Sequence, residues 1–345
     1  MPAMKFRKST IAVLAAVSLL ACPAQAFAGY GHGGSTNSDP TTHTSGDSDG
    51  KGDLSATAGV VYDLSKNGSG ASAGAVSSTT TWTPPACYYA PKYSPDELEA
   101  YLTPIWAADS TGYEWDATQR DRYVNGKPYK DFNKDKAGKG YWWDSYVTPG
   151  REGDPGALDC TKPIFWVDTG EDPPADIPQA VTPEILSQLA YNQIRVPSTK
   201  VTLAPADRTK VNLPTWAWLD GAEFKPVSVT ASVPALGISA TTTATPYSLK
   251  IDPGTSDAVT YPASGVCEFK SGSIGEAYAK GKADETPPCG VKYLRSSGTG
   301  SYPLQATITW KISWTGTGTP GGTLPDGTFG ATQNVVVQEI QSVNR

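Results

Sequence analysis

Alternation of apolar and polar residues near the carboxyl end constrains the fold of this chain more than any other feature. In residues 308–314, Ile-Thr-Trp-Lys-Ile-Ser-Trp, every second residue is apolar. The same period of two appears over 227–233 and 238–245, and residues 335–343 supply a last predicted strand. Strands that are buried on one face have this period, and Gly/Pro-rich turns separate them here. We therefore expect residues 199–345 to form an antiparallel β-sandwich.

The amino terminus has the order of a secretory signal. Basic residues precede a short apolar run over 11–21, and small residues follow it. That run is well short of the roughly 20 residues that span a bilayer, so we expect no transmembrane helix in the mature chain. We expect residues 1–28 to be removed as a signal peptide. Lipidation of Cys22 is the alternative, because the preceding Leu-Leu-Ala resembles a lipoprotein cleavage site.

Four cysteines follow this signal: Cys87, Cys160, Cys267 and Cys289. An even number in an exported chain favours disulfides, and the absence of a C-x-x-C pair speaks against metal binding or redox chemistry. Several pairings are possible. We favour Cys87–Cys160 and Cys267–Cys289, since each bridge then stays within one predicted domain. Four buried free thiols are the alternative.

Scarce histidine and acidic charge exclude several function classes. His32 and His43 are the only two histidines, and the formal net charge is −6. Without histidine in its body the chain is a poor candidate for a triad hydrolase, a zinc enzyme or a histidine-based nuclease. The net negative charge does not favour binding to nucleic acid, which is itself negatively charged. With no Walker-type loop either, we expect no nucleotide, no nucleic acid and no cofactor.

Composition divides the rest of the chain at about residue 82. Residues 29–81 are mostly Gly, Ser and Thr, with Val60-Val61-Tyr62 as the only ordered-looking piece. Such a segment buries too little surface to offset its ordering entropy, so we expect a disordered tether. Residues 82–198 are rich in aromatic and charged residues.

Two helix starts stand out within 82–198. Ser94-Pro95-Asp96-Glu97 is a capping box, and Thr182-Pro183-Glu184 has a similar Thr/Pro start. The residues between the two predicted helices are Gly/Pro-heavy and irregular. We expect a small, loop-rich, α-containing domain closed by Cys87–Cys160. The whole chain is then α+β but mostly β.

Tryptophans are the strongest candidates for ligand binding. Trp142, Trp143, Trp106 and Trp115 lie in a region with few aliphatic residues. Two adjacent tryptophans often cannot both point inward, and an exposed one marks a recognition surface. The other interpretation, which we favour, is a small core that uses aromatic area instead of aliphatic volume.

Four separated motifs are distinctive: Trp82-x-Pro84-Pro85-x-Cys87-x-Tyr89, Leu213-Pro214-Thr215-Trp216-x-Trp218, Cys289 with Tyr293-x-Arg295-Ser296-Ser297, and Thr307-x-Thr309-Trp310-x-Ile312-Ser313-Trp314. Together they resemble a family of secreted actinobacterial proteins of uncharacterised function. The resemblance covers most of residues 82–345. It implies an extracytoplasmic protein whose carboxyl half is similar to PKD or immunoglobulin-like sandwiches, and it implies no catalytic residues. Such domains often carry a Gly-Asp-Gly turn, which reads Asp252-Pro253-Gly254 here.

Acidic residues offer two weaker possibilities. Asp131, Asn133 and Asp135 alternate like the ligands of a calcium loop, but the glycine and the bidentate glutamate of that loop are missing. We therefore favour a solvated loop without metal. A glycosidase needs two carboxylates across a cleft and no histidine. The candidates for that role are Asp109, Glu114, Asp116 and Asp121.

Two glycine motifs have simpler explanations than catalysis or nucleotide binding. The residues after Gly316-x-Gly318-x-x-Gly321 cannot form the helix that would bind a pyrophosphate, so we expect a flexible hairpin loop. Gly70-x-Ser72-x-Gly74 matches a hydrolase motif but lies in the predicted tether, without a histidine base.

These patterns favour a secreted, cell-envelope-associated, non-enzymatic binding or scaffold protein of adhesion type. The expected partner is a cell-wall polysaccharide or another envelope protein. One alternative is a carbohydrate-binding or carbohydrate-active protein that uses the aromatic domain. The other is a subunit of a surface appendage.

Overall fold

The computed structural model describes residues 59–69, 73–108, 111–197, 200–219, 224–270 and 272–340. The predicted signal peptide, Cys22, both histidines, Asp109, Gly70 and Ser72 lie outside these ranges. Within the described ranges, no helix is both long enough and apolar enough to cross a membrane.

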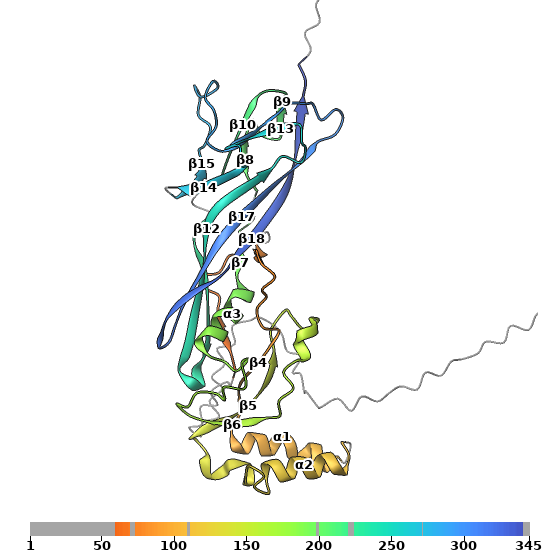
Figure 1. The fold of residues 1–345 in the computed structure, drawn as a ribbon, viewed down its shortest axis with the longest axis vertical. Helices are drawn as coiled ribbons and strands as arrows, with labels where there is room; N and C mark the ends of the chain where they lie inside the picture. The colour runs from red at the N-terminus through yellow and green to blue at the C-terminus, as the bar shows by residue number, and fades with distance from the viewer. Residues whose placement is uncertain are drawn as a thin grey trace, which may run out of the picture. The chain divides into compact units, whose positions relative to one another are not determined.

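Long antiparallel strands dominate the described chain (Figure 1). β12 (Ile238–Asp252), β17 (Tyr302–Gly316) and β18 (Thr319–Gln338) lie side by side, and β11 (Val227–Val233) pairs with β12. The predicted mostly-β class is confirmed. The predicted last strand is longer than expected, because β18 begins directly after a tight turn at residues 317–318. The flexible loop expected beyond Gly318 is therefore a paired strand.

The period of two has the expected cause. Ile308, Trp310 and Ile312 are buried on the inner face of β17, whereas Lys311 between them and Ser313 after them are exposed. Burial of such side chains contributes about 1.5–3 kcal/mol each, which fixes the face and therefore the register of the strand.

A second group of short strands makes the fold sandwich-like. β10 is hydrogen-bonded to β8 on one side and to β15 and β16 on the other, and β14 pairs with both β12 and β15. β13 extends this group beside β16, while β9 runs parallel to the end of β18. The strands are β8 (Thr202–Ala204), β9 (Arg208–Lys210), β10 (Pro214–Leu219), β13 (Ala258–Tyr261), β14 (Val266–Lys270), β15 (Ser273–Gly275) and β16 (Gly290–Tyr293).

Helix α3 (Pro183–Gln193) lies against the inner face of the long strands. As predicted, it begins after Thr182, whose hydroxyl accepts a hydrogen bond from the backbone N–H of Ile185. Its buried residues include Leu186 and Leu189. The Thr242 hydroxyl of β12 donates to the carbonyl of Ser187 over 2.8 Å, which fixes the helix on the sheet.

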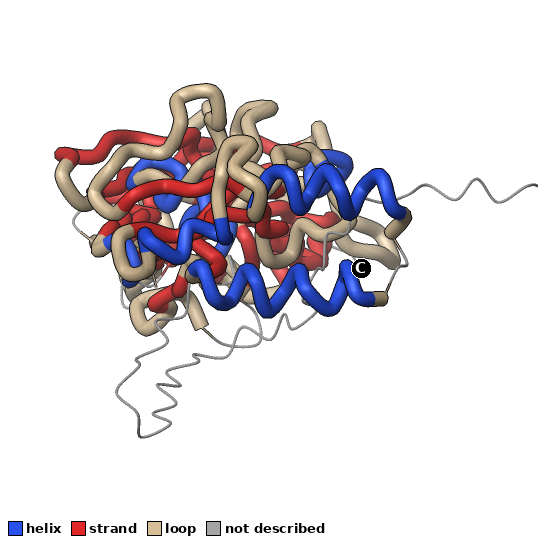
Figure 2. Tube along the Cα trace, turned by 90° about the horizontal axis from the view of Figure 1, so that it is seen from below, coloured by secondary structure: helices blue, strands red, loops and turns tan. Residues whose placement is uncertain are grey.

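A separate three-stranded meander carries the other two helices. β4 (Cys87–Tyr93), β5 (Gly140–Val147) and β6 (Phe165–Asp168) are antiparallel neighbours. α1 (Pro95–Ala107) begins with the predicted capping box, and α2 (Tyr113–Tyr123) follows it. Seen from below, helices lie in front of the strands (Figure 2). Short 3-10 turns complete this part: η1 (Asp131–Lys136) and η2 (Pro155–Leu158), with η3 (Pro234–Leu236) after β11.

The predicted tether is wrong over its described part. β1 (Val61–Asp63) pairs with β11, β2 (Gly74–Ala75) with β7 (Arg195–Val196), and β3 (Ser77–Ser78) with β18. Small residues gain order here because sheet edges offer unpaired backbone groups, which need no large apolar side chain. The structured chain therefore starts before residue 82.

One apolar core crosses the predicted boundary at residue 198. Trp143 and Leu186 from the first predicted domain share a buried cluster with Ile308 and Trp310 from the second. α3 makes this link, since its apolar face packs on strands that lie far along the chain.

Both predicted disulfides are present. Cys87 is bonded to Cys160, and Cys267 is bonded to Cys289. All four cysteines are at most 3% exposed.

Candidate functional site

The structure places three of the four candidate tryptophans in the core. Trp142 and Trp143 are 0% and 1% exposed, and Trp106 is 6% exposed. Adjacent residues of a strand face opposite sides, so both can be buried only if both faces of β5 are covered. Trp142 belongs to a cluster with α1 residues, whereas Trp143 belongs to the main core. Of the two interpretations of this pair, burial therefore supports the aromatic core and not a recognition surface.

Trp142 is held by specific contacts. Its indole N–H donates to the carbonyl of Phe132 over 3.0 Å. Its ring meets Tyr129 and Trp166 edge to face, with centroid distances of 4.6 and 5.3 Å. Such pairs contribute about 0.5–1.5 kcal/mol beyond the area that they bury. Trp115, which is half-buried, packs against the same cluster.

The calcium-like residues lie in η1 and have other partners. Asp131 lies 3.9 Å from Lys134, the side chain of Lys139 donates to the backbone carbonyl of Asp135, and Asn133 is buried. Asp144, the next acidic residue along the chain, pairs with Lys92, with 2.8 Å between Oδ2 and Nζ. Over the described part of the chain, no group of three or more acidic, histidine or cysteine side chains has metal-binding geometry.

The described glycosidase candidates lie on one helix rather than across a cleft. Glu114, Asp116 and Asp121 all belong to α2. Asp116 accepts a hydrogen bond from Thr111, and Asp121 accepts from Asn125 and Lys127. The Asn125 bond, followed by the Lys127 bond, lowers the pKa of Asp121. The carboxylates of Asp116 and Asp121 therefore have local structural partners.

Tyrosines surround the Lys92–Asp144 ion pair on the meander. The Lys92 ammonium lies 5.0 Å from the ring centroid of Tyr146 and 5.5 Å from that of Tyr93. Removal from water raises the pKa of both phenols above 10.0, and the nearby Asp144 carboxylate adds to this. The lysine charge is thus neutralised within the cluster, which favours a structural role.

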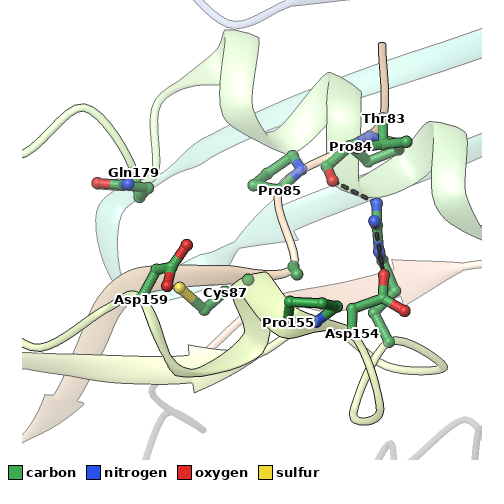
Figure 3. Close-up of a pocket in the computed structure, with 11 residues that line it drawn as sticks. Thr83, Pro84, Pro85, Cys87, Asp154, Pro155, Asp159 and Gln179 are labelled. Carbon is green, nitrogen blue, oxygen red and sulfur yellow. Dashed lines mark hydrogen bonds and ion pairs between the residues drawn. The ribbon is translucent and has the colours of Figure 1, made fainter. Parts of the chain in front are cut away.

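A pocket of about 380 Å³ lies beside the Cys87–Cys160 bridge. Asp159 and Asp154 lie on opposite sides of it in Figure 3, with Pro155 between them. Three separate segments line it: Thr83, Pro84, Pro85, Ala86 and Cys87 before and at the start of β4, Arg151, Asp154, Pro155, Gly156 and Asp159 around η2, and Gln179.

Rigid elements build this pocket. The Arg151 guanidinium pairs with Asp154 over 2.6 Å and donates to the carbonyl of Pro84. The Thr148 hydroxyl donates to the carbonyl of Pro85 over 2.7 Å. Proline has a fixed φ, so a pocket built on Pro84 and Pro85 loses little entropy when a ligand binds.

The polar groups of the pocket are not equivalent. Both Arg151 contacts with Asp154 go to the same oxygen, Oδ2, and the Arg151 side chain is only 15% exposed. Asp159 is exposed, and its carboxylate has no hydrogen bond or ion pair with any described residue. The open functional groups are therefore the Asp159 carboxylate, Oδ1 of Asp154 and the amide of Gln179.

A second pocket of about 380 Å³ lies at the start of α3. Its walls are largely apolar and include Pro174, Ile177, Pro178 and Ile185, with Glu184 as its only charged residue. The segment 177–180 contributes to both pockets, because Gln179 lines the first and Pro178 lines the second.

The pocket residues were not among the sequence-based candidates. A partial signal existed, since Pro84-Pro85 belongs to the motif that contains Cys87, and Arg151-Glu-Gly-Asp154-Pro155-Gly156 is a turn sequence. No sequence motif indicated that Gln179, which lies far from both segments along the chain, would line the same pocket.

Comparisons with known proteins add no assignment. The chain matches no model of a protein family, and searches of curated proteins and of solved structures give no significant match.

Proposed function

We propose that the protein is an extracytoplasmic, cell-envelope-associated, non-enzymatic binding or scaffold protein. One observation carries this proposal: Cys87, half of a buried disulfide, lines a preorganised pocket that holds open polar groups. Disulfides persist in oxidising compartments, so the pocket has its full support only outside the cytoplasm. The second buried bridge supports the same location.

The pocket supports binding rather than catalysis. Its one guanidinium is committed to Asp154 and to the carbonyl of Pro84. Its volume is near the lower end of the range for ligand sites, about 300–1,000 Å³. Such a pocket fits a single side group of a larger partner, either an envelope protein or a wall polymer.

The carboxyl-terminal strands suit the scaffold role. Long paired strands hold α3, and a proline-rich segment ending at α3 supplies Gln179 to the pocket. We further propose a PKD- or immunoglobulin-like identity for residues 199–345, which the antiparallel, sandwich-like pairing supports. The carbohydrate alternative has less support, because three of its four tryptophans are buried and no aromatic side chain lines the pocket.

Filling the pocket tests this function. Gly156 has an ordinary φ, and a Cβ there would meet only Ala86 and Asp159 at 3.5 and 3.6 Å, so G156L places a side chain in the pocket. At Gly153 a Cβ would meet nothing within 4 Å, so G153L is a matched control.

The measurement is co-sedimentation of oxidised protein with envelope material of the producing cells. We expect wild type and G153L to be retained and G156L to be released. Equal retention of all three proteins would contradict the proposal.

A further inference from the structure

The charge balance of the pocket selects for cations. Asp154 and Asp159 contribute two carboxylates, and Arg151 contributes the only positive charge. Since Arg151 is already paired with Asp154, the Asp159 carboxylate carries an uncompensated negative charge. The net charge of the whole chain, −6, attracts cations as well.

The apolar walls of the pocket favour a cation at the end of an aliphatic chain. Pro84, Pro85 and Ala86 form an apolar side, and Pro155 lies between the two carboxylates (Figure 3). An extended aliphatic stem contacts such walls while its charged end reaches an acidic group. A sugar ring is less suitable, because aromatic faces for stacking are missing from the lining.

A metal ion fits the same groups poorly. Hard cations such as calcium take about 6–8 oxygen ligands, whereas this pocket offers two carboxylates, one of which is bonded to Arg151. An ammonium group needs only about three acceptors. The Asp159 carboxylate supplies the counter-charge for such a group, and Gln179 adds a polar side chain to the same lining.

From this chemistry we infer that the pocket binds an alkylammonium side chain, as found in lysine and in other diamino acids. The inference rests on the proposed function, since it names the group by which the partner enters the pocket. That group comes either from a lysine of an envelope protein or from a diamino acid in a wall peptide.

The test compares two probes with the same number of side-chain carbons, Nα-acetyl-lysine amide and the uncharged Nα-acetyl-norleucine amide. Binding to the intact, oxidised protein is followed through the backbone amide signals of Ala86 and Gly156. We expect the lysine probe to bind, more weakly at high salt, and the norleucine probe not to bind. We expect D159N to weaken binding by about fivefold, the upper end for an exposed ion pair. D172N, at an exposed carboxylate outside both pockets, leaves binding unchanged.

Three results overturn the inference: no binding of the lysine probe, equal binding of both probes, or full binding by D159N. If G156L is still released from envelope material in those cases, the proposed function stands and only the ligand class is wrong. If G156L is retained, the proposed function fails. Competition by the lysine probe, measured separately on wall polymer and on envelope proteins, distinguishes the two sources of the ammonium group.

Discussion

The adjacent tryptophans of β5, which lie in two different buried clusters, allow a matched test of one buried hydrogen bond. Trp142 and Trp143 are equally buried, but only Trp142 has a hydrogen-bond partner for its indole N–H, the carbonyl of Phe132. The Trp143 indole N–H has none among the described residues. Replacement by phenylalanine removes the same atoms from both sites. The cavity terms are therefore similar, and the difference reports the hydrogen bond.

The expected difference follows from the cost of unsatisfied groups. W142F leaves the buried carbonyl of Phe132 without its partner, which costs about 1–3 kcal/mol. W143F instead removes a buried donor that is already unsatisfied, so part of its cavity cost is offset. We expect W142F to be less stable than W143F by about 2 kcal/mol.

Guanidinium denaturation followed by far-UV circular dichroism measures this difference. With an m-value of about 6 kcal/mol/M, the midpoint of W142F lies about 0.3 M below that of W143F. Equal m-values and intact disulfides in both variants are the controls. Equal midpoints, or a lower midpoint for W143F, would refute the claim that a hydrogen bond of the Trp142 indole N–H makes the difference.

Further predictions concern the hairpin, alkaline stability and the bridges. At Gly321, where φ is +86°, a Cβ would lie 1.9 Å from the carbonyl oxygen of Trp314, so G321A lowers the thermal midpoint far more than G318A, whose Cβ meets open space. Burial raises the pKa of Tyr191 from 10.0 to about 12, so the folded state keeps a proton that the unfolded chain releases. Stability therefore falls as pH rises from about 10 through about 12, and denaturation of Y191F shows a weaker fall. Serine replacement of Cys267–Cys289, which spans 22 residues, costs roughly 3 kcal/mol, and that of Cys87–Cys160, which spans 73, roughly 4. If loss of the Cys267–Cys289 bridge lowers stability in denaturant more than loss of the Cys87–Cys160 bridge, the chain-entropy account is contradicted.

Local signals predicted local structure well. The capping box at Ser94 and the Thr182 start predicted α1 and α3, and alternation predicted β11, β12 and β17. α2 was missed because its sequence has no apolar stripe and Gly112 at its start supplies no side-chain cap. The two bridges were predicted correctly on the argument that each stays within one predicted domain, although Cys87–Cys160 spans 73 residues.

Long-range contacts account for what the sequence did not predict. Whether Trp142 is exposed depends on α1 and η1, which cover its face of the meander. Whether Val61 is ordered depends on the edge of β11, far along the chain. The pocket needs Pro84, Arg151 and Gln179 in one place, and no window of sequence contains all three.

Disulfide mapping of the native protein by mass spectrometry, without reduction, tests the central claim most directly. An oxidised, exported scaffold yields linked peptides that join Cys87 to Cys160 and Cys267 to Cys289, with no alkylated cysteine among these four. Alkylation of all four in unreduced material from the producing cells would contradict an extracytoplasmic binding protein.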